Sequence, residues 1–152
     1  MTNHSQFPLI GICLLLMAAT CNTAAAQDAV RTEDPVLLGK WTVTENAKNG
    51  PITLVKEHAN GTTTLTAFDA TKRVLYAKTS QYHTEMHGKI KVFVFSNSKY
   101  TAGPDAGKTD KRTKSYVYRV DGKRFYEVRG MVDGVEESPG MVVWERVDSP
   151  AT

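Results

Sequence analysis

The sequence predicts an all-β fold, an antiparallel up-and-down barrel of eight strands preceded by a signal peptide. Apolar residues after residue 36 recur with a period of two rather than the helical period of about 3.6. Turn pairs such as Asn60-Gly61 and Asp121-Gly122 separate these runs at short, regular spacing. Eight antiparallel strands in sequence order can close on themselves and leave no free sheet edge. An open sandwich of two sheets is the alternative architecture.

The first 26 residues are interpreted as a signal peptide, because they contain no Lys, Arg, Asp or Glu. Residues 9–19 form an apolar run of eleven residues, which suits a signal-peptide core and is shorter than the roughly 20 residues that span a bilayer. Small residues up to Ala26 favour cleavage there, so we expect export to the periplasm or beyond and no transmembrane span in the mature chain. Lipid anchoring at Cys21 is disfavoured, because a threonine precedes it. Cleavage would remove Cys13 and Cys21 and leave 126 residues without cysteine.

The mature chain divides into three parts. Residues 27–36 are polar and are expected to form a flexible lead-in, residues 37–148 the barrel domain, and residues 149–152 a tail. The predicted strands cover residues 37–45, 52–58, 62–68, 74–85, 90–95, 115–120, 123–132 and 141–147.

The inward face is ambiguous in only one predicted strand. Between residues 90 and 95, the positions of Val92 and Val94 alternate with those of Phe93 and Phe95, so both faces are apolar. Residues 96–113 follow as the longest predicted break between strands, rich in Ser, Gly, Asp and Lys.

The first predicted strand carries Gly39-Lys40-Trp41, and the last carries Arg146. These two short motifs resemble the Gly-x-Trp opening and the closing-strand arginine of the lipocalin-like, or calycin, group of barrels, and in particular of small secreted bacterial domains of this type. The resemblance implies that Arg146 packs over Trp41 as a structural clasp, with a cation–π contact worth about 0.5–2 kcal/mol.

The chain also departs from these families. Residues 46–50 leave no room for the two-helix lid of fatty-acid-binding proteins, and the five residues after Val147 are too few to form the helix that follows the last strand of a typical lipocalin. The resemblance therefore implies a fold and leaves the ligand open, since one fold carries many functions.

Aromatic residues in the predicted strands are candidates for a ligand pocket. Tyr76, Phe93, Tyr116, Tyr118 and Phe125 would line a cavity if the barrel is hollow. The same rings would simply fill the core if the barrel is solid.

A metal site is a third possibility. His83, Glu85 and His87 alternate along one predicted strand and therefore share a face. Two imidazoles and a carboxylate form a donor set that suits a divalent metal. The turn signal at His87-Gly88 opposes this interpretation, because it would twist His87 away.

The net charge of +3 is too small to indicate a nucleic-acid binder, and export makes such a partner unsuitable. Residues 89–124 nevertheless hold ten basic and three acidic residues. This basic stretch would let a solid barrel act as an interaction module on an anionic envelope surface.

The mature chain contains no motif for a catalytic nucleophile and no glycine-rich phosphate loop. We therefore favour a non-catalytic role without a cofactor. The leading hypothesis is an exported barrel that binds a small apolar or amphipathic ligand.

Overall fold

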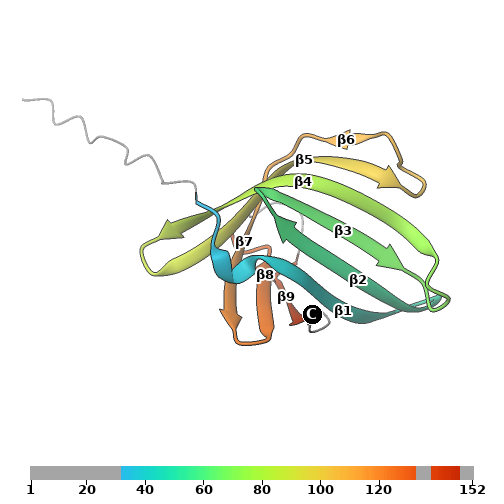
Figure 1. Ribbon diagram of the computed structural model, residues 1–152, viewed down its shortest axis with the longest axis horizontal. Helices are drawn as coiled ribbons and strands as arrows, with labels where there is room; N and C mark the ends of the chain where they lie inside the picture. Colours follow the sequence, from blue (N-terminus) through green and yellow to red (C-terminus); the bar gives the residue numbers. More distant parts are fainter. Residues whose placement is uncertain (1–31, 133–137, 148–152) are drawn as a thin grey trace, which may run out of the picture.

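The period-two alternation produces a closed antiparallel β-barrel, as the computed structural model shows (Figure 1). The structure describes residues 32–132 and 138–147. The strands are β1 (Gly39–Ala47), β2 (Gly50–Ala59), β3 (Thr62–Phe68), β4 (Val74–His87), β5 (Ile90–Ala102), β6 (Thr109–Asp110), β7 (Lys114–Asp121), β8 (Arg124–Arg129) and β9 (Gly140–Arg146).

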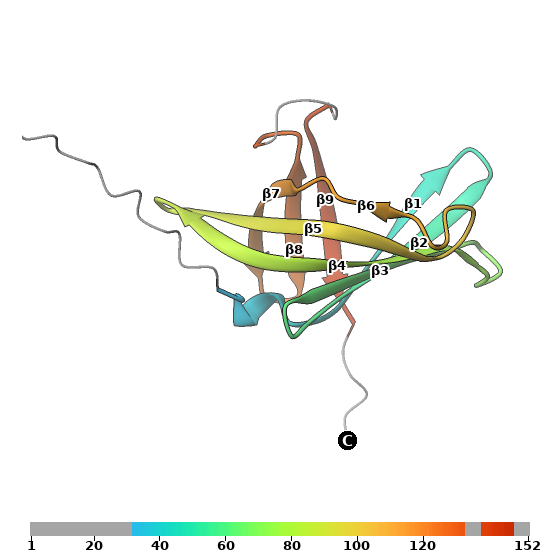
Figure 2. The same ribbon diagram turned by 90° about the horizontal axis from the view of Figure 1, so that it is seen from above.

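Eight strands form the barrel wall in sequence order. Neighbours pair from β1 to β5, then β5 pairs with β7, β7 with β8, and β8 with β9. Pairing of β9 with β1 closes the ring, and β7, β8 and β9 run steeply across β4 and β5 (Figure 2). The eight-stranded barrel prediction is confirmed, and the open sandwich is wrong.

The strand β5 is longer than predicted, and the break at residues 96–113 is shorter. The strand continues to Ala102 because it keeps pairing with β4 across two register shifts. Asn97, at φ 52°, absorbs one of these irregularities, and buried Ser98 then bonds to Ser80 at 2.7 Å. The two-residue strand β6 pairs with the far part of β5 inside the predicted break.

The last residues of the lead-in make specific contacts at one end of the barrel. Thr32 bridges to Thr84 of β4, and Glu33 accepts hydrogen bonds from the Tyr82 hydroxyl and the Gly61 amide. A 3₁₀ helix (Pro35–Leu37) follows and buries Leu37 completely. The predicted flexible lead-in thus includes residues that cover this end of the barrel, because their carboxylate and backbone groups find partners on the wall.

The most tightly packed part of the core lies beside this covered end. Fully buried side chains there include Leu37, Trp41, Phe125 and Trp144. Phe93 and Phe95 point inward from β5, which settles the face that the sequence left ambiguous.

The predicted signal peptide (1–26), with Cys13, Cys21 and Ala26, lies outside the described residues, as does the predicted tail (149–152). Within the described residues, no helix is long and apolar enough to cross a membrane.

Candidate functional site

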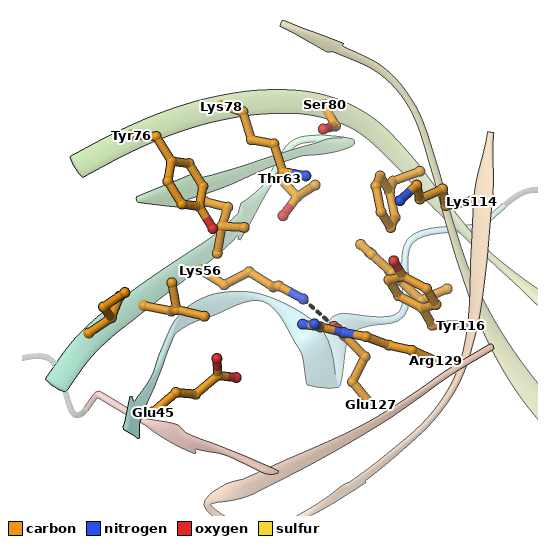
Figure 3. A pocket seen from close by; sticks show the side chains of 15 residues that line it. Glu45, Lys56, Thr63, Tyr76, Lys78, Ser80, Lys114, Tyr116, Glu127 and Arg129 are labelled. Atoms are coloured by element: carbon orange, nitrogen blue, oxygen red, sulfur yellow. Dashed lines mark hydrogen bonds and ion pairs between the residues drawn. The ribbon is translucent and has the colours of Figure 1, made fainter. Parts of the chain in front are cut away.

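A cavity of about 260 Å³ lies in the barrel, on the side away from the 3₁₀ helix (Figure 3). Inward positions of seven strands supply its walls, and it reaches the surface near the exposed Glu45. The lining residues are Glu45, Ile52, Leu54, Lys56, Thr63, Leu65, Tyr76, Lys78, Ser80, Phe93, Phe95, Lys114, Tyr116, Glu127 and Arg129.

Three of the five predicted ligand residues line this cavity. They are Tyr76 on β4, Phe93 on β5 and Tyr116 on β7. The other two lie deeper and do not line it. The Tyr118 hydroxyl donates to a carboxylate of the lead-in at 2.8 Å, and Phe125 packs against the tryptophans of β1 and β9.

A buried charge cluster that the sequence analysis missed forms the floor of the cavity. Glu127 is completely buried and accepts hydrogen bonds from Lys56 and from Arg129, the latter at 2.9 Å. Burial alone would raise the pKa of Glu127, but the two positive charges outweigh it and lower the pKa. The Lys56 ammonium also lies 4.3 Å from the centre of a Trp144 ring.

Burial also acts on Lys56 itself. It lowers the pKa of this ammonium, and the charge of Glu127 opposes the shift. The alternation along β2 is the signal that could have located this group, since Lys56 stands between the inward positions of Leu54 and His58.

His58 lies beneath this cluster with both ring nitrogens unpaired among the described residues. Its imidazole meets the rings of Tyr82 and Phe93 edge-on, with centroids 5.0 and 5.1 Å away. Burial, and then the positive charge of Lys56, lowers the pKa of His58 to about 3. The imidazole is therefore neutral at pH 7.

The wall formed by β3 and β4 is polar. Thr63 is paired with Ser80 and Leu65 with Lys78, and all four side chains line the cavity. The Lys78 ammonium lies 5.6 Å from the centre of the Phe95 ring. Figure 3 shows the Lys78 amine reaching down the wall toward Thr63.

The three predicted clasp residues come together at the seam between β1 and β9. The Arg146 guanidinium lies 4.1 Å from the centre of the Trp41 ring and donates to two backbone carbonyls at 2.7 and 2.8 Å. Gly39 has φ +104°, and a side chain there would place Cβ 3.2 Å from the guanidinium. Because β1 and β9 pair over two residues only, this contact reinforces the shortest seam of the barrel.

The predicted metal donors lie on the outer face of β4, away from the cavity. His83 and His87 each bond to Glu85, at 2.7 and 3.1 Å, through different carboxylate oxygens. Hydrogen bonds from both imidazoles lower the pKa of Glu85. The structure thus pairs these residues with one another, and over residues 32–132 and 138–147 no group of three or more His, Cys, Asp or Glu side chains is arranged to hold a metal ion.

The basic stretch 89–124 does not present all its charges to solvent unpaired. Several of its cations bond to carboxylates nearby: Lys91 to Asp34, Lys108 to Asp105, Arg112 to Asp110 and Arg119 to Asp121. Another member, Lys114, lines the cavity.

Comparisons with protein-family models, curated proteins and solved structures find no significant match to the chain.

Proposed function

We propose that the protein binds one small amphipathic molecule in the barrel cavity, without catalysis. One observation carries this proposal: a barrel of this size is either filled or hollow, and this one holds a cavity of about 260 Å³. The lining combines aromatic and aliphatic side chains with a few polar groups, which is the usual composition of small-molecule sites.

The size of the cavity limits the ligand. Because one water occupies roughly 30 Å³ in the liquid, the space suits a molecule of about ten non-hydrogen atoms. At roughly −0.4 to −0.8 kcal/mol per atom, such a ligand would bind with a dissociation constant in the micromolar to millimolar range. Burial of its apolar surface, at about 25 cal/mol per Å², would provide the main driving force.

Two alternatives from the sequence have less support. An interaction module was expected to have a solid barrel and an open basic face, whereas the cavity and the ion pairs of Lys91 and Arg112 favour ligand binding. A metal-dependent activity would need donors that converge, whereas His83 and His87 turn to opposite oxygens of Glu85.

We also propose that binding takes place after export, because the first 26 residues have the composition of a signal peptide. N-terminal sequencing of the protein recovered from its host would test this. A mature chain that begins at Gln27 is expected, and a chain that still begins at Met1 would contradict it.

An NMR titration with octan-1-ol, a neutral amphipath of suitable size, tests the binding proposal. Saturable shifts are expected at inward residues of β2, β3, β5 and β7. Leu65→Trp, which fills the cavity, should abolish them. Thr66→Trp, at the next position and on the opposite face of β3, serves as the matched control and should preserve them. Saturable binding that survives Leu65→Trp, or no binding to the unaltered protein, would refute the proposal.

A further inference from the structure

The charges around the cavity are unbalanced. Four cationic side chains line it, Lys56, Lys78, Lys114 and Arg129, against two carboxylates, Glu45 and Glu127. Because Glu127 already accepts from two of these cations on the cavity floor, its charge is engaged there. The upper part of the cavity therefore carries an excess of positive charge.

Lys78 is the cation with the poorest compensation. Among the described residues its ammonium forms no hydrogen bond and no ion pair, and its one ring contact is with Phe95. Burial, and then the positive charges of Lys114 and Arg129, lowers the pKa of Lys78, and the more weakly acting charges of Asp110 and Glu127 only partly oppose this shift. A desolvated ammonium beside two further cations is stabilised when an anion binds near it.

An unpaired hydroxyl lies on the same wall. Thr63 is only 6% exposed, it lines the cavity, and its Oγ1 has no hydrogen-bond partner among the described residues. Since Leu65 is paired with Lys78 across β3 and β4, Thr63 is the diagonal neighbour of Lys78 on the inward face. A buried polar group without a partner is unfavourable unless a ligand supplies one.

The rest of the lining is apolar or aromatic around this polar pair. Leu54, Phe93, Phe95 and Tyr116 are all buried and face the same space. They suit the apolar body of a ligand whose charged end lies against β3 and β4. One ammonium and one hydroxyl match the size and single charge of a carboxylate.

We propose that the cavity selects a small amphipathic anion, a carboxylate with a short apolar body, whose charged group lies between Lys78 Nζ and Thr63 Oγ1. This inference rests on the proposed ligand-binding function and adds the chemical class of the ligand and the residues that distinguish it.

Octanoate and octan-1-ol form a matched pair of probes, because they share an apolar chain and differ in charge. Isothermal titration calorimetry at pH 7.5 should give octanoate a dissociation constant about tenfold lower than that of octan-1-ol. Lys78→Met should remove this preference, so that the two dissociation constants agree within about twofold, and retained octan-1-ol binding would show that the variant keeps its cavity. Thr63→Val should weaken octanoate about threefold more than octan-1-ol. Lys99→Met, an exposed lysine on β5, is the control and should alter neither.

The outcomes separate the two proposals. If neither compound binds, the ligand-binding function itself fails. If octan-1-ol binds and octanoate binds no more tightly, the function stands and the anion inference is overturned. A preference for octanoate that persists in Lys78→Met would also overturn it, because the charge would then be recognised elsewhere. Tighter binding of octyl phosphate than of octanoate would overturn the choice of a carboxylate.

Discussion

The unpaired imidazole of His58 should make the barrel less stable in mild acid. The ring is 1% exposed, and burial, with the nearby charge of Lys56, lowers its pKa from 6.5 to about 3. In the unfolded chain the imidazole takes up a proton below about pH 6.5, whereas in the folded barrel it stays neutral until about pH 3. Acid therefore favours the unfolded state over this interval, and the stability associated with His58 is lost as the pH falls.

The size of the effect follows from the two pKa values. Each pH unit between them is worth about 1.4 kcal/mol, so the free energy of unfolding should fall by about 2 kcal/mol between pH 7 and pH 5 on account of His58. This window lies above the ordinary pKa values of Asp and Glu, so carboxylates contribute little to the slope. His58→Phe should abolish this component. It should change stability at pH 7 by no more than about 1 kcal/mol, because phenylalanine keeps the edge-on ring contacts and leaves no nitrogen unpaired.

Urea denaturation at half-unit steps from pH 7 to pH 5 provides the measurement, with the free energy of unfolding compared between the protein and His58→Phe. His87→Gln is the control, because replacing this exposed histidine should leave the pH dependence of the free energy of unfolding unchanged. A difference between the unaltered protein and His58→Phe that stays constant within about 0.5 kcal/mol across this range would refute the reasoning.

Three further mutational experiments test the packing. Arg146→Lys removes the stacking of the guanidinium on the Trp41 ring and its two hydrogen bonds to backbone carbonyls at the β1–β9 seam. It should lower the free energy of unfolding in urea by about 1–2 kcal/mol, and an unchanged midpoint would contradict this. Gly103→Ala should cost about 3 kcal/mol, because φ is +91° and Cβ would lie 2.5 Å from a carbonyl oxygen of β4. Gly88→Ala is the matched control, because its Cβ would meet open space and only the positive φ would be unfavourable, so it should cost about 1 kcal/mol. Equal losses of thermal stability in the two variants would contradict the close approach inferred at Gly103. Lys56→Met should lower the free energy of unfolding by about 3–5 kcal/mol, because it leaves the Glu127 carboxylate buried without this partner. The double variant Lys56→Met/Glu127→Leu should lose less, and additive losses would exclude coupling between the two side chains.

The architecture was predictable because its signals are local. Turn pairs such as Asn60-Gly61 coincide with the hairpin between β2 and β3, and alternation in the flanking runs defines their faces. The bounds of β5 were not predictable in the same way. Pairing with β4 and a positive φ at Asn97 carry this strand through polar residues that resemble a loop when considered alone.

The candidate site was predictable only in part. Aromatic residues at strand positions can be anticipated to point inward, and Tyr76, Phe93 and Tyr116 do line the cavity. Tyr118 and Phe125 belong to the same pattern, yet they pack in the covered half of the barrel. The position of a side chain along the barrel axis depends on the tilt and register of its strand. Neither quantity can be read from the sequence pattern of that strand alone.

The charged floor of the cavity shows that the inward–outward alternation of side chains along a strand predicts orientation even where it places a charged residue inside the barrel. On β2 the inward series runs through Leu54, Lys56 and His58, and a hydrophobicity argument would treat the lysine as an exception. An isolated buried ammonium is very unfavourable, so a lysine at an inward position implies a buried carboxylate on a strand across the barrel. In β8 the inward series contains one such residue, Glu127, beside Phe125. The buried lysine and its carboxylate therefore constrain each other's strand register. An inward lysine that forms no hydrogen bond and no ion pair, as is true of Lys78 among the described residues, points to a ligand that supplies the opposite charge.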